Sequence, residues 1–188
     1  MNKLTEFIEE MTAVVEKYKN AKERMTEAER LISKLICDAS WLPADKRVPC
    51  PDHYARYPLY HDPQDRFEII ALAWQPGQQT PIHDHDGTWG VEGVVAGRMK
   101  VTNYLQIGKV SDYVVKLRHA GTLTINEQST GQLLPPADCH VLEAEGDETV
   151  ITIHVYGKKL CHFKIFEPLE EQETYLAHSH EVAYSANS

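Results

Sequence analysis

The chain has 188 residues, of which 42% are hydrophobic and 25% charged, a balance typical of a globular domain rather than a disordered chain. Its formal net charge of −9 repels phosphate backbones, so we expect no nucleic-acid partner. The longest apolar run, residues 69–74, is far too short to cross a membrane, and the N-terminus lacks the apolar core of a signal peptide. We therefore expect a cytoplasmic protein without a membrane partner, and the four cysteines, which form no C-x-x-C pair, fit that compartment.

Residues 1–48 are predicted to be helical, because apolar side chains recur there at helical spacing. In the first helix they are Phe7, Ile8, Met11, Val14, Val15 and Tyr18, and in the second Leu31, Ile32, Leu35 and Ile36. Thr26, followed by Glu29, predicts a capping box at the start of the second helix. Each helix has one apolar face, which we expect to cover one side of a sheet.

Residues 49–168 show short runs rich in β-branched and aromatic residues, separated by turns that contain glycine or proline. The runs are residues 67–74, 90–95, 100–105, 113–117 and 150–156. Strands repeating about every 8–12 residues indicate a sandwich or barrel rather than a parallel α/β fold. Residues 169–188 are expected to form a loosely packed tail, in which His178 and His180 lie on no strand. The whole chain is thus predicted to be a single domain.

The most informative motif is Gly77-x5-His83-Asp84-His85, placed where a predicted strand ends. Two histidines at positions i and i+2 of a strand project to the same face, so both can bind one metal ion. Asp84 lies between them and is expected to point the other way. His140 is the third candidate ligand. Imidazole ligands by themselves suit iron, copper, nickel and zinc alike, so the spacing does not identify the metal.

These motifs resemble those of the cupin superfamily, small β-barrels that hold a metal ion in the barrel mouth. In the pattern G-x5-H-x-H-x3-4-E-x6-G, the chain matches the final glycine at Gly97 but has Gly90 where a carboxylate ligand is usual. The second pattern, P-x-G-x2-H-x3-N, is matched at Pro135 and His140 and departs at Ala137 and Ala144. The resemblance implies a mainly β fold, a cupin-type double-stranded β-helix (jelly-roll) barrel with an N-terminal α-helical segment, and a neutral three-histidine ligand set.

A closer resemblance is to the bacterial cysteine dioxygenases, and it covers residues 40–166 or so. It rests on the run from Arg66 to Trp74, the His83-x-His85 pair, His140, and the segment from Thr152 to Tyr156. Members of this family use one Fe(II) and no organic cofactor to oxidise a thiol with O2. The resemblance therefore implies that L-cysteine is oxidised to cysteine sulfinate at an iron held by His83, His85 and His140.

Thr152, His154 and Tyr156 alternate along one predicted strand, so all three can point into the same interior. The resemblance makes His154 and Tyr156 catalytic, as part of a hydrogen-bonded row that directs the tyrosine hydroxyl at the iron. Mammalian relatives crosslink this tyrosine to a cysteine, but Gly90 occupies the cysteine position here. We therefore expect no thioether on Tyr156.

Arg56 is the predicted substrate-binding residue. The resemblance implies that it binds the substrate carboxylate, and a planar guanidinium can do so through two parallel hydrogen bonds. Tyr54 is expected to support the same carboxylate, and Trp74 to line the substrate pocket.

The sequence is also compatible with two other functions. One is a 3-mercaptopropionate dioxygenase, a subfamily that shares the glycine at Gly90 but usually has glutamine in place of Arg56 and relies on an arginine near the C-terminus. This chain has no arginine after Arg118, which favours cysteine. The other is a non-catalytic cupin that only binds a metal or a small ligand. In either case the protein is expected to be a monomer or a weakly associating homo-oligomer.

Overall fold

The computed structural model describes residues 2–133, 135 and 138–185, and in this part of the chain two helices precede a mainly β body. The helices are α1 (Lys3–Lys17) and α2 (Ala21–Leu35), followed by the short 3-10 helices η1 (Ala39–Trp41) and η2 (Ala44–Lys46). Among the described helices, none has the length and apolar character needed to span a bilayer. The predicted helical start of the chain is confirmed.

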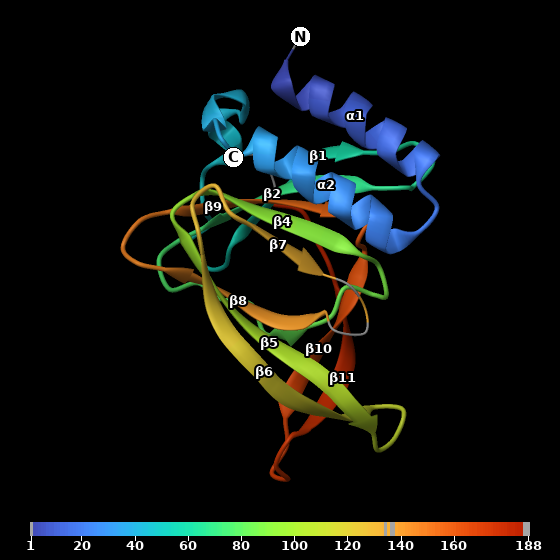
Figure 1. The fold of residues 1–188 in the computed structure, drawn as a ribbon. Coiled ribbons are helices and arrows are strands. Elements are labelled where there is room, and N and C mark those ends of the chain that lie inside the picture. The colour runs from blue at the N-terminus through green and yellow to red at the C-terminus, as the bar shows by residue number, and fades with distance from the viewer. Residues whose placement is uncertain (1, 134, 136–137, 186–188) are drawn as a thin grey trace.

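Within the described residues, eleven strands form two sheets, all of whose strand pairs are antiparallel. The first sheet has the order β1 (Ala55–His61), β2 (Glu68–Trp74), β9 (Val150–Tyr156), β4 (Gly90–Ala96), β7 (Thr130–Leu133). The second closes as β10 (His162–Pro168), β11 (Thr174–Glu181), β6 (Val114–Asn126), β5 (Arg98–Lys109), β8 (Cys139–Glu145), β3 (Ile82–His83). Figure 1 shows the helices on the outer face of the first sheet and the second sheet beyond its inner face. This is the predicted double-stranded β-helix with two N-terminal helices.

The central strands of the first sheet are buried on both faces, which explains why their sequences read as continuous apolar runs. On β2, Ile69, Ala71 and Ala73 belong to the cluster that contains both helices, and Ile70, Leu72 and Trp74 belong to the barrel cluster. Because successive side chains of a strand point to opposite faces, β9 divides in the same way. Thr152, His154 and Tyr156 therefore face the barrel, as the sequence predicted, opposite the face of Ile151, Ile153 and Val155.

Two glycines permit close approaches that shape this sheet. A Cβ atom on Gly93 would lie 2.7 Å from Cγ2 of Ile32, so glycine lets α2 pack directly onto β4. Gly97, between β4 and β5, has φ +80°, a conformation that favours glycine, and a Cβ there would lie 3.0 Å from Cγ2 of Val150. Gly97 therefore lies where the chain passes from the first sheet to the second, since β4 and β5 belong to different sheets.

The predicted capping box at Thr26 is wrong. Helix α2 begins five residues earlier than Thr26 with Asn20 as its N-cap, whose side chain accepts a hydrogen bond of 2.8 Å from the Lys22 N–H. The Thr26 hydroxyl instead donates to the Lys22 carbonyl within the helix. Asparagine caps a helix as well as threonine does, and the apolar stripe already includes Met25 and Ala28, so the helix begins at the earlier residue.

The predicted loose tail is also wrong over residues 174–181, which form β11. This strand pairs with β10, where His178 lies opposite Ile165 and His180 opposite Phe163, and with β6. Its polar side chains resemble those of a solvated tail, but its backbone hydrogen bonds are satisfied within the barrel, and Thr174 and Ala177 are buried. Ala137, the predicted replacement for a motif glycine, lies outside the described residues.

Candidate metal centre

Three histidines from separate parts of the barrel meet in the interior. His83 is the last residue of β3, His140 lies opposite it on β8, and His85 lies in the loop that follows β3 rather than on the strand. One nitrogen from each ring lies within 4.8 Å of the others, and all three residues are buried. We refer to them as the three-histidine group. The predicted metal-binding arrangement is thus assembled, with His85 reaching it from a loop.

Hydrogen bonds orient two of these rings. Nδ1 of His83 lies 3.1 Å from the carbonyl oxygen of Pro81, and Nδ1 of His85 lies 3.1 Å from that of Asp138. A carbonyl accepts only, so each Nδ1 carries the proton and leaves the Nε2 lone pair free for a metal. Neither ring nitrogen of His140 has a hydrogen-bond partner among the described residues, although the residue is fully buried. Buried polar atoms are rarely left unsatisfied. A bound metal ion would satisfy one of the two ring nitrogens of His140.

Burial also keeps the rings of His83 and His140 neutral. Desolvation, reinforced by the neighbouring His85, lowers the pKa of His83 to about 3, and desolvation lowers the pKa of His140 well below its ordinary value. Metal ligands must be deprotonated, so these two rings are ready to bind a cation at neutral pH. Three imidazole nitrogens fit a divalent transition metal.

The Thr152–His154–Tyr156 row lies beside the three-histidine group. The Thr152 hydroxyl is 2.8 Å from Nε2 of His154, and the Tyr156 hydroxyl is 3.2 Å from Nδ1 of the same ring. Trp74 donates to the Thr152 hydroxyl at 3.1 Å, which ties β2 to this row. The Tyr156 ring is stacked on His85 with 5.6 Å between ring centroids, so the row adjoins the candidate metal ligands.

Gly90 lies directly opposite Tyr156 on the neighbouring strand. A Cβ atom at Gly90 would lie 3.0 Å from Cδ1 of the tyrosine ring. The tyrosine ring therefore occupies the space that a side chain at residue 90 would take. No side chain from residue 90 reaches the three-histidine group.

Arg56 lies on the barrel face of β1, since its neighbours Ala55 and Tyr57 belong to the helix-side cluster. Only 6% of the residue is exposed, and its Nε and Nη2 atoms have no hydrogen-bond partner among the described residues. Its guanidinium carbon lies 6.0 Å from the centre of the Tyr156 ring. Nearby, the predicted pair Tyr54 and Trp74 stack with centroids 4.3 Å apart. The structure thus brings an incompletely paired cation next to the tyrosine row.

Three residues of this interior were not predicted from the sequence: Glu68, Glu92 and Tyr184. Glu68 is fully buried with its Oε2 atom 4.0 Å from Nη2 of Arg56. Glu92 is buried with Oε2 3.6 Å from Nδ1 of His154, and desolvation raises its pKa to about 7. Both glutamates occupy barrel-facing positions of apolar strands, a pattern that could have identified them. Tyr184 carries no comparable local signal.

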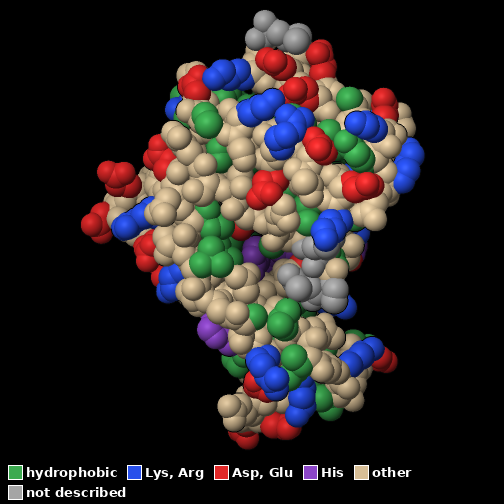
Figure 2. Space-filling model, in the orientation of Figure 1, with side chains coloured by type: hydrophobic (Ala, Val, Ile, Leu, Met, Phe, Trp, Pro, Cys, Tyr) green, Lys and Arg blue, Asp and Glu red, His purple; other side chains and the backbone are tan. Residues whose placement is uncertain are grey.

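On the face shown in Figure 2, histidine side chains are visible in a hollow between the helical end of the molecule and the end formed by β5 and β6. Acidic and basic side chains are mixed over the rest of that face, without a continuous basic patch in view.

Residues 51–168 match the protein family described as Cysteine dioxygenase type I. Among solved structures, the chain is similar to an uncharacterized conserved protein with a double-stranded beta-helix domain from Klebsiella pneumoniae subsp. pneumoniae MGH 78578, with 16% identity over 69% of this chain and 93% of that one and a TM-score of 0.49. A protein from Thermus thermophilus matches with 17% identity, 59% and 89% coverage, and a TM-score of 0.46. The cupin domain of Cnp3 from Schizosaccharomyces pombe matches with 13% identity, 56% and 60% coverage, and a TM-score of 0.42. The family match includes every strand that carries the three-histidine group, the Thr152–His154–Tyr156 row or Arg56.

Proposed function

Because the chain belongs to the cysteine dioxygenase type I family, we propose that it is an Fe(II)-dependent thiol dioxygenase that oxidises L-cysteine with O2 to cysteine sulfinate. The observation that carries the substrate assignment is the state of Arg56. Its Nε and Nη2 atoms, which lie on one edge of the guanidinium, are buried without a hydrogen-bond partner among the described residues. A carboxylate fits that edge through two parallel charge-assisted hydrogen bonds.

The three-histidine group would hold the iron through Nε2 of His83, Nε2 of His85 and one ring nitrogen of His140. When bound, the iron supplies the redox chemistry that adds both atoms of O2 to the substrate sulfur. The ligands are neutral, so they leave the charge of the cation available to an anion, and that favours a thiolate over a thiol. No carboxylate from residue 90 competes for this charge.

The tyrosine row supplies a positioned proton. When the Thr152 hydroxyl donates to Nε2 of His154, Nδ1–H of that ring donates to the Tyr156 oxygen, and the tyrosine proton is free to hydrogen-bond a ligand in the barrel. Burial raises the pKa of Tyr156, so its hydroxyl stays protonated at neutral pH. Tyr156 thus serves as a donor to the reacting groups, and His154 sets its orientation.

The decisive test compares L-cysteine, 3-mercaptopropionate and cysteamine on the iron-loaded protein, measuring O2 uptake and the sulfinate product by mass spectrometry. We expect L-cysteine to have the highest kcat/KM, because it combines the carboxylate for Arg56 with an amine and a thiol for the metal. Cysteamine lacks the carboxylate and should be a poor substrate. The variant His140→Ala serves as the metal-deficient control.

A 3-mercaptopropionate dioxygenase is the second candidate, and Gly90 opposite Tyr156 is the feature it shares with that subfamily. The same assay separates the two, because a higher kcat/KM for 3-mercaptopropionate than for L-cysteine would replace our substrate assignment. Full metal occupancy without O2 uptake on any thiol would instead favour a non-catalytic metal-binding cupin.

A further inference from the structure

Residues 182–185, which we term the C-terminal strap, join the barrel next to Arg56. The N–H of Val182 donates to the Cys161 carbonyl at 2.8 Å. At the other end, the Ser185 N–H donates to the Arg56 carbonyl at 2.8 Å, and the Arg56 N–H donates to the Ser185 hydroxyl at 2.9 Å. The strap is therefore fixed to the backbone of the residue that we assign to the substrate carboxylate.

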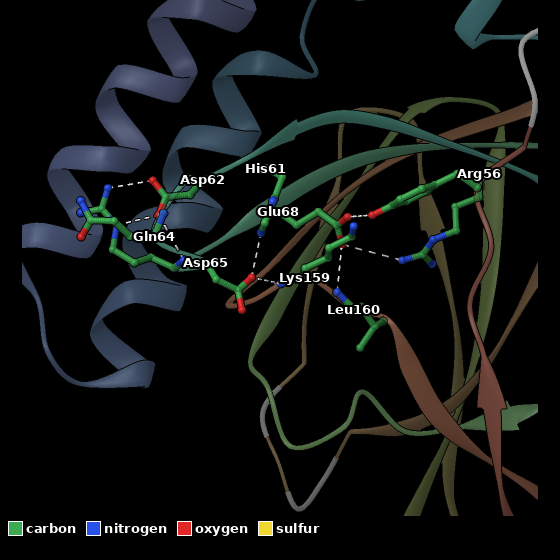
Figure 3. A network of polar contacts seen from close by, with 10 residues as sticks. Arg56, His61, Asp62, Gln64, Asp65, Glu68, Lys159 and Leu160 are labelled. Atoms are coloured by element: carbon green, nitrogen blue, oxygen red, sulfur yellow. Dashed lines mark hydrogen bonds and ion pairs between the residues drawn. The ribbon is translucent and has the colours of Figure 1, made fainter.

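Tyr184 connects the strap to Glu68. Its hydroxyl donates to Oε1 of Glu68, and the Leu160 N–H donates to Oε2 of the same carboxylate at 3.1 Å. Figure 3 shows Glu68 directed toward Arg56, with a dashed line for their ion pair of 4.0 Å. Glu68 is fully buried, so it depends on these donors and on Arg56 to compensate for lost hydration.

The ring of Tyr184 also contacts Arg56 directly. The guanidinium carbon lies 5.8 Å from the centre of the Tyr184 ring and 6.0 Å from that of Tyr156, both within the range of a cation–π interaction. A long arginine side chain loses rotamer freedom when it is fixed, so a fixed guanidinium needs contacts of this kind. With Glu68 and two rings around it, Arg56 is held while its Nε and Nη2 atoms keep no hydrogen-bond partner among the described residues.

We propose that Tyr184 is a positioning residue for carboxylate recognition, which holds Arg56 through Glu68 and through its own ring. The inference rests on the proposed function for the identity of the ligand carboxylate. It assigns to the C-terminal strap a part in substrate selection, although the strap lies outside the region matched by the family.

The test measures binding without turnover. We would load the full chain with Zn(II), which does not oxidise thiols, and titrate L-cysteine and cysteamine into the parent, Tyr184→Phe and Tyr184→Ala by calorimetry. Tyr184→Phe removes only the hydroxyl, and we expect it to weaken L-cysteine binding by roughly fivefold, the equivalent of one hydrogen bond of about 1 kcal/mol. Tyr184→Ala should weaken it further, and cysteamine binding should change by less than about twofold.

Tyr113→Phe is the matched control, because it makes the same chemical change at a tyrosine that is 70% exposed. Thermal unfolding of each variant shows whether a change in binding follows from loss of folding. In the Glu68→Leu background, which offers the Tyr184 hydroxyl no acceptor, Tyr184→Phe should have no further effect, because the two residues act in series. Three results would each overturn the inference. They are an undiminished effect of Tyr184→Phe in that background, an unchanged affinity for L-cysteine in Tyr184→Phe alone, and an equal loss of affinity for cysteamine.

The proposed function fails separately. If the iron-loaded parent consumes no O2 while the zinc-loaded protein still prefers L-cysteine over cysteamine through Tyr184, the dioxygenase assignment is lost and the strap retains its role. If the zinc-loaded parent binds both thiols equally, no carboxylate is recognised, and the inference about Tyr184 is wrong.

Discussion

The two faces of the first sheet are built from alternating residues of the same strands, yet they have opposite characters. The helix-facing residues of β9 are Ile151, Ile153 and Val155, which pack in one apolar cluster with α1 and α2. The barrel-facing residues are polar toward the end of the strand and include His154 and Tyr156. The apolar face packs against the helices and so fixes the strands that carry the polar face. On the polar face, several titratable groups are desolvated. The predictions below test how separable the two faces are.

The largest effect is expected for His140→Ala, which removes a barrel-side metal ligand. A site with two remaining histidines competes poorly with water, so we expect most of the iron to be lost, along with O2 uptake on L-cysteine. Metal analysis by mass spectrometry measures the first and an oxygen electrode the second. His119→Ala, at an exposed histidine, is the control. Full iron occupancy in His140→Ala would remove this residue from the ligand set.

On the opposite face of the sheet, Ile153→Ala should reduce the free energy of unfolding by about 2–5 kcal/mol, because it leaves a cavity in the cluster shared with the helices. Ile153 is fully buried. At a temperature where the variant stays folded, iron content and KM for L-cysteine should remain close to those of the parent. Denaturant unfolding and steady-state assays measure the two quantities. A large loss of iron in the folded variant would show that the faces are coupled.

Glu92 lies on the barrel face, and its ionisation should make stability depend on pH. Its pKa is about 7 in the folded protein against an ordinary 4.5, so the folded state keeps a proton that the unfolded chain releases between these values. The contribution of Glu92 to the free energy of unfolding is therefore fully present below pH 4.5 and falls as the pH rises to about 7. Over this pH range, the free energy of unfolding should fall by at most about 3 kcal/mol because of Glu92.

Glu92→Gln removes this ionisation, so the loss of stability between pH 5 and pH 8 should be smaller in the variant than in the parent. Melting temperatures of the two metal-free proteins across this range measure the difference, since the buried histidines titrate in both. Parallel curves would mean that Glu92 is not held neutral by its surroundings.

Arg56→Ala tests whether the barrel face of the sheet binds the substrate carboxylate. The lost pair of charge-assisted hydrogen bonds corresponds to about 1.5–3 kcal/mol, or roughly a ten- to hundredfold lower kcat/KM for L-cysteine. Cysteamine has no carboxylate, so its kcat/KM should change little. Arg56→Gln should narrow the preference for L-cysteine over 3-mercaptopropionate. Equal losses for L-cysteine and cysteamine would point to a structural effect on the buried interior instead.

The smallest effect is expected for Tyr156→Phe, which keeps the ring and removes the hydroxyl. Iron content should be unchanged, and kcat should fall by about tenfold, since the lost donor is worth about 1.4 kcal/mol. Tyr113→Phe again controls for the chemical change at an exposed position. The intact mass of the parent after turnover should show no thioether, because Gly90 offers no sulfur opposite the ring. An unchanged kcat would exclude a role for this hydroxyl.

Short-range patterns in the sequence predicted much of this molecule. A period of two along residues 150–156 placed Thr152, His154 and Tyr156 on one face, because side chains of a strand must alternate. His83 and His85 also lie close together, although His85 follows the strand and reaches the three-histidine group from a loop. Local preferences failed where two of them competed, as at Asn20 and Thr26, both of which are good helix caps.

Only the tertiary structure decided which distant residues meet. His140 reaches His83 because β8 pairs with β3, and the polar strand β11 is ordered because β10 and β6 satisfy its backbone. Glu68 and Tyr184 are separated by 116 positions, and no local periodicity links them. The reason is physical: spacing along a strand or helix follows from backbone geometry within a few residues, whereas the charge of Arg56 is oriented by partners that the closed barrel brings together.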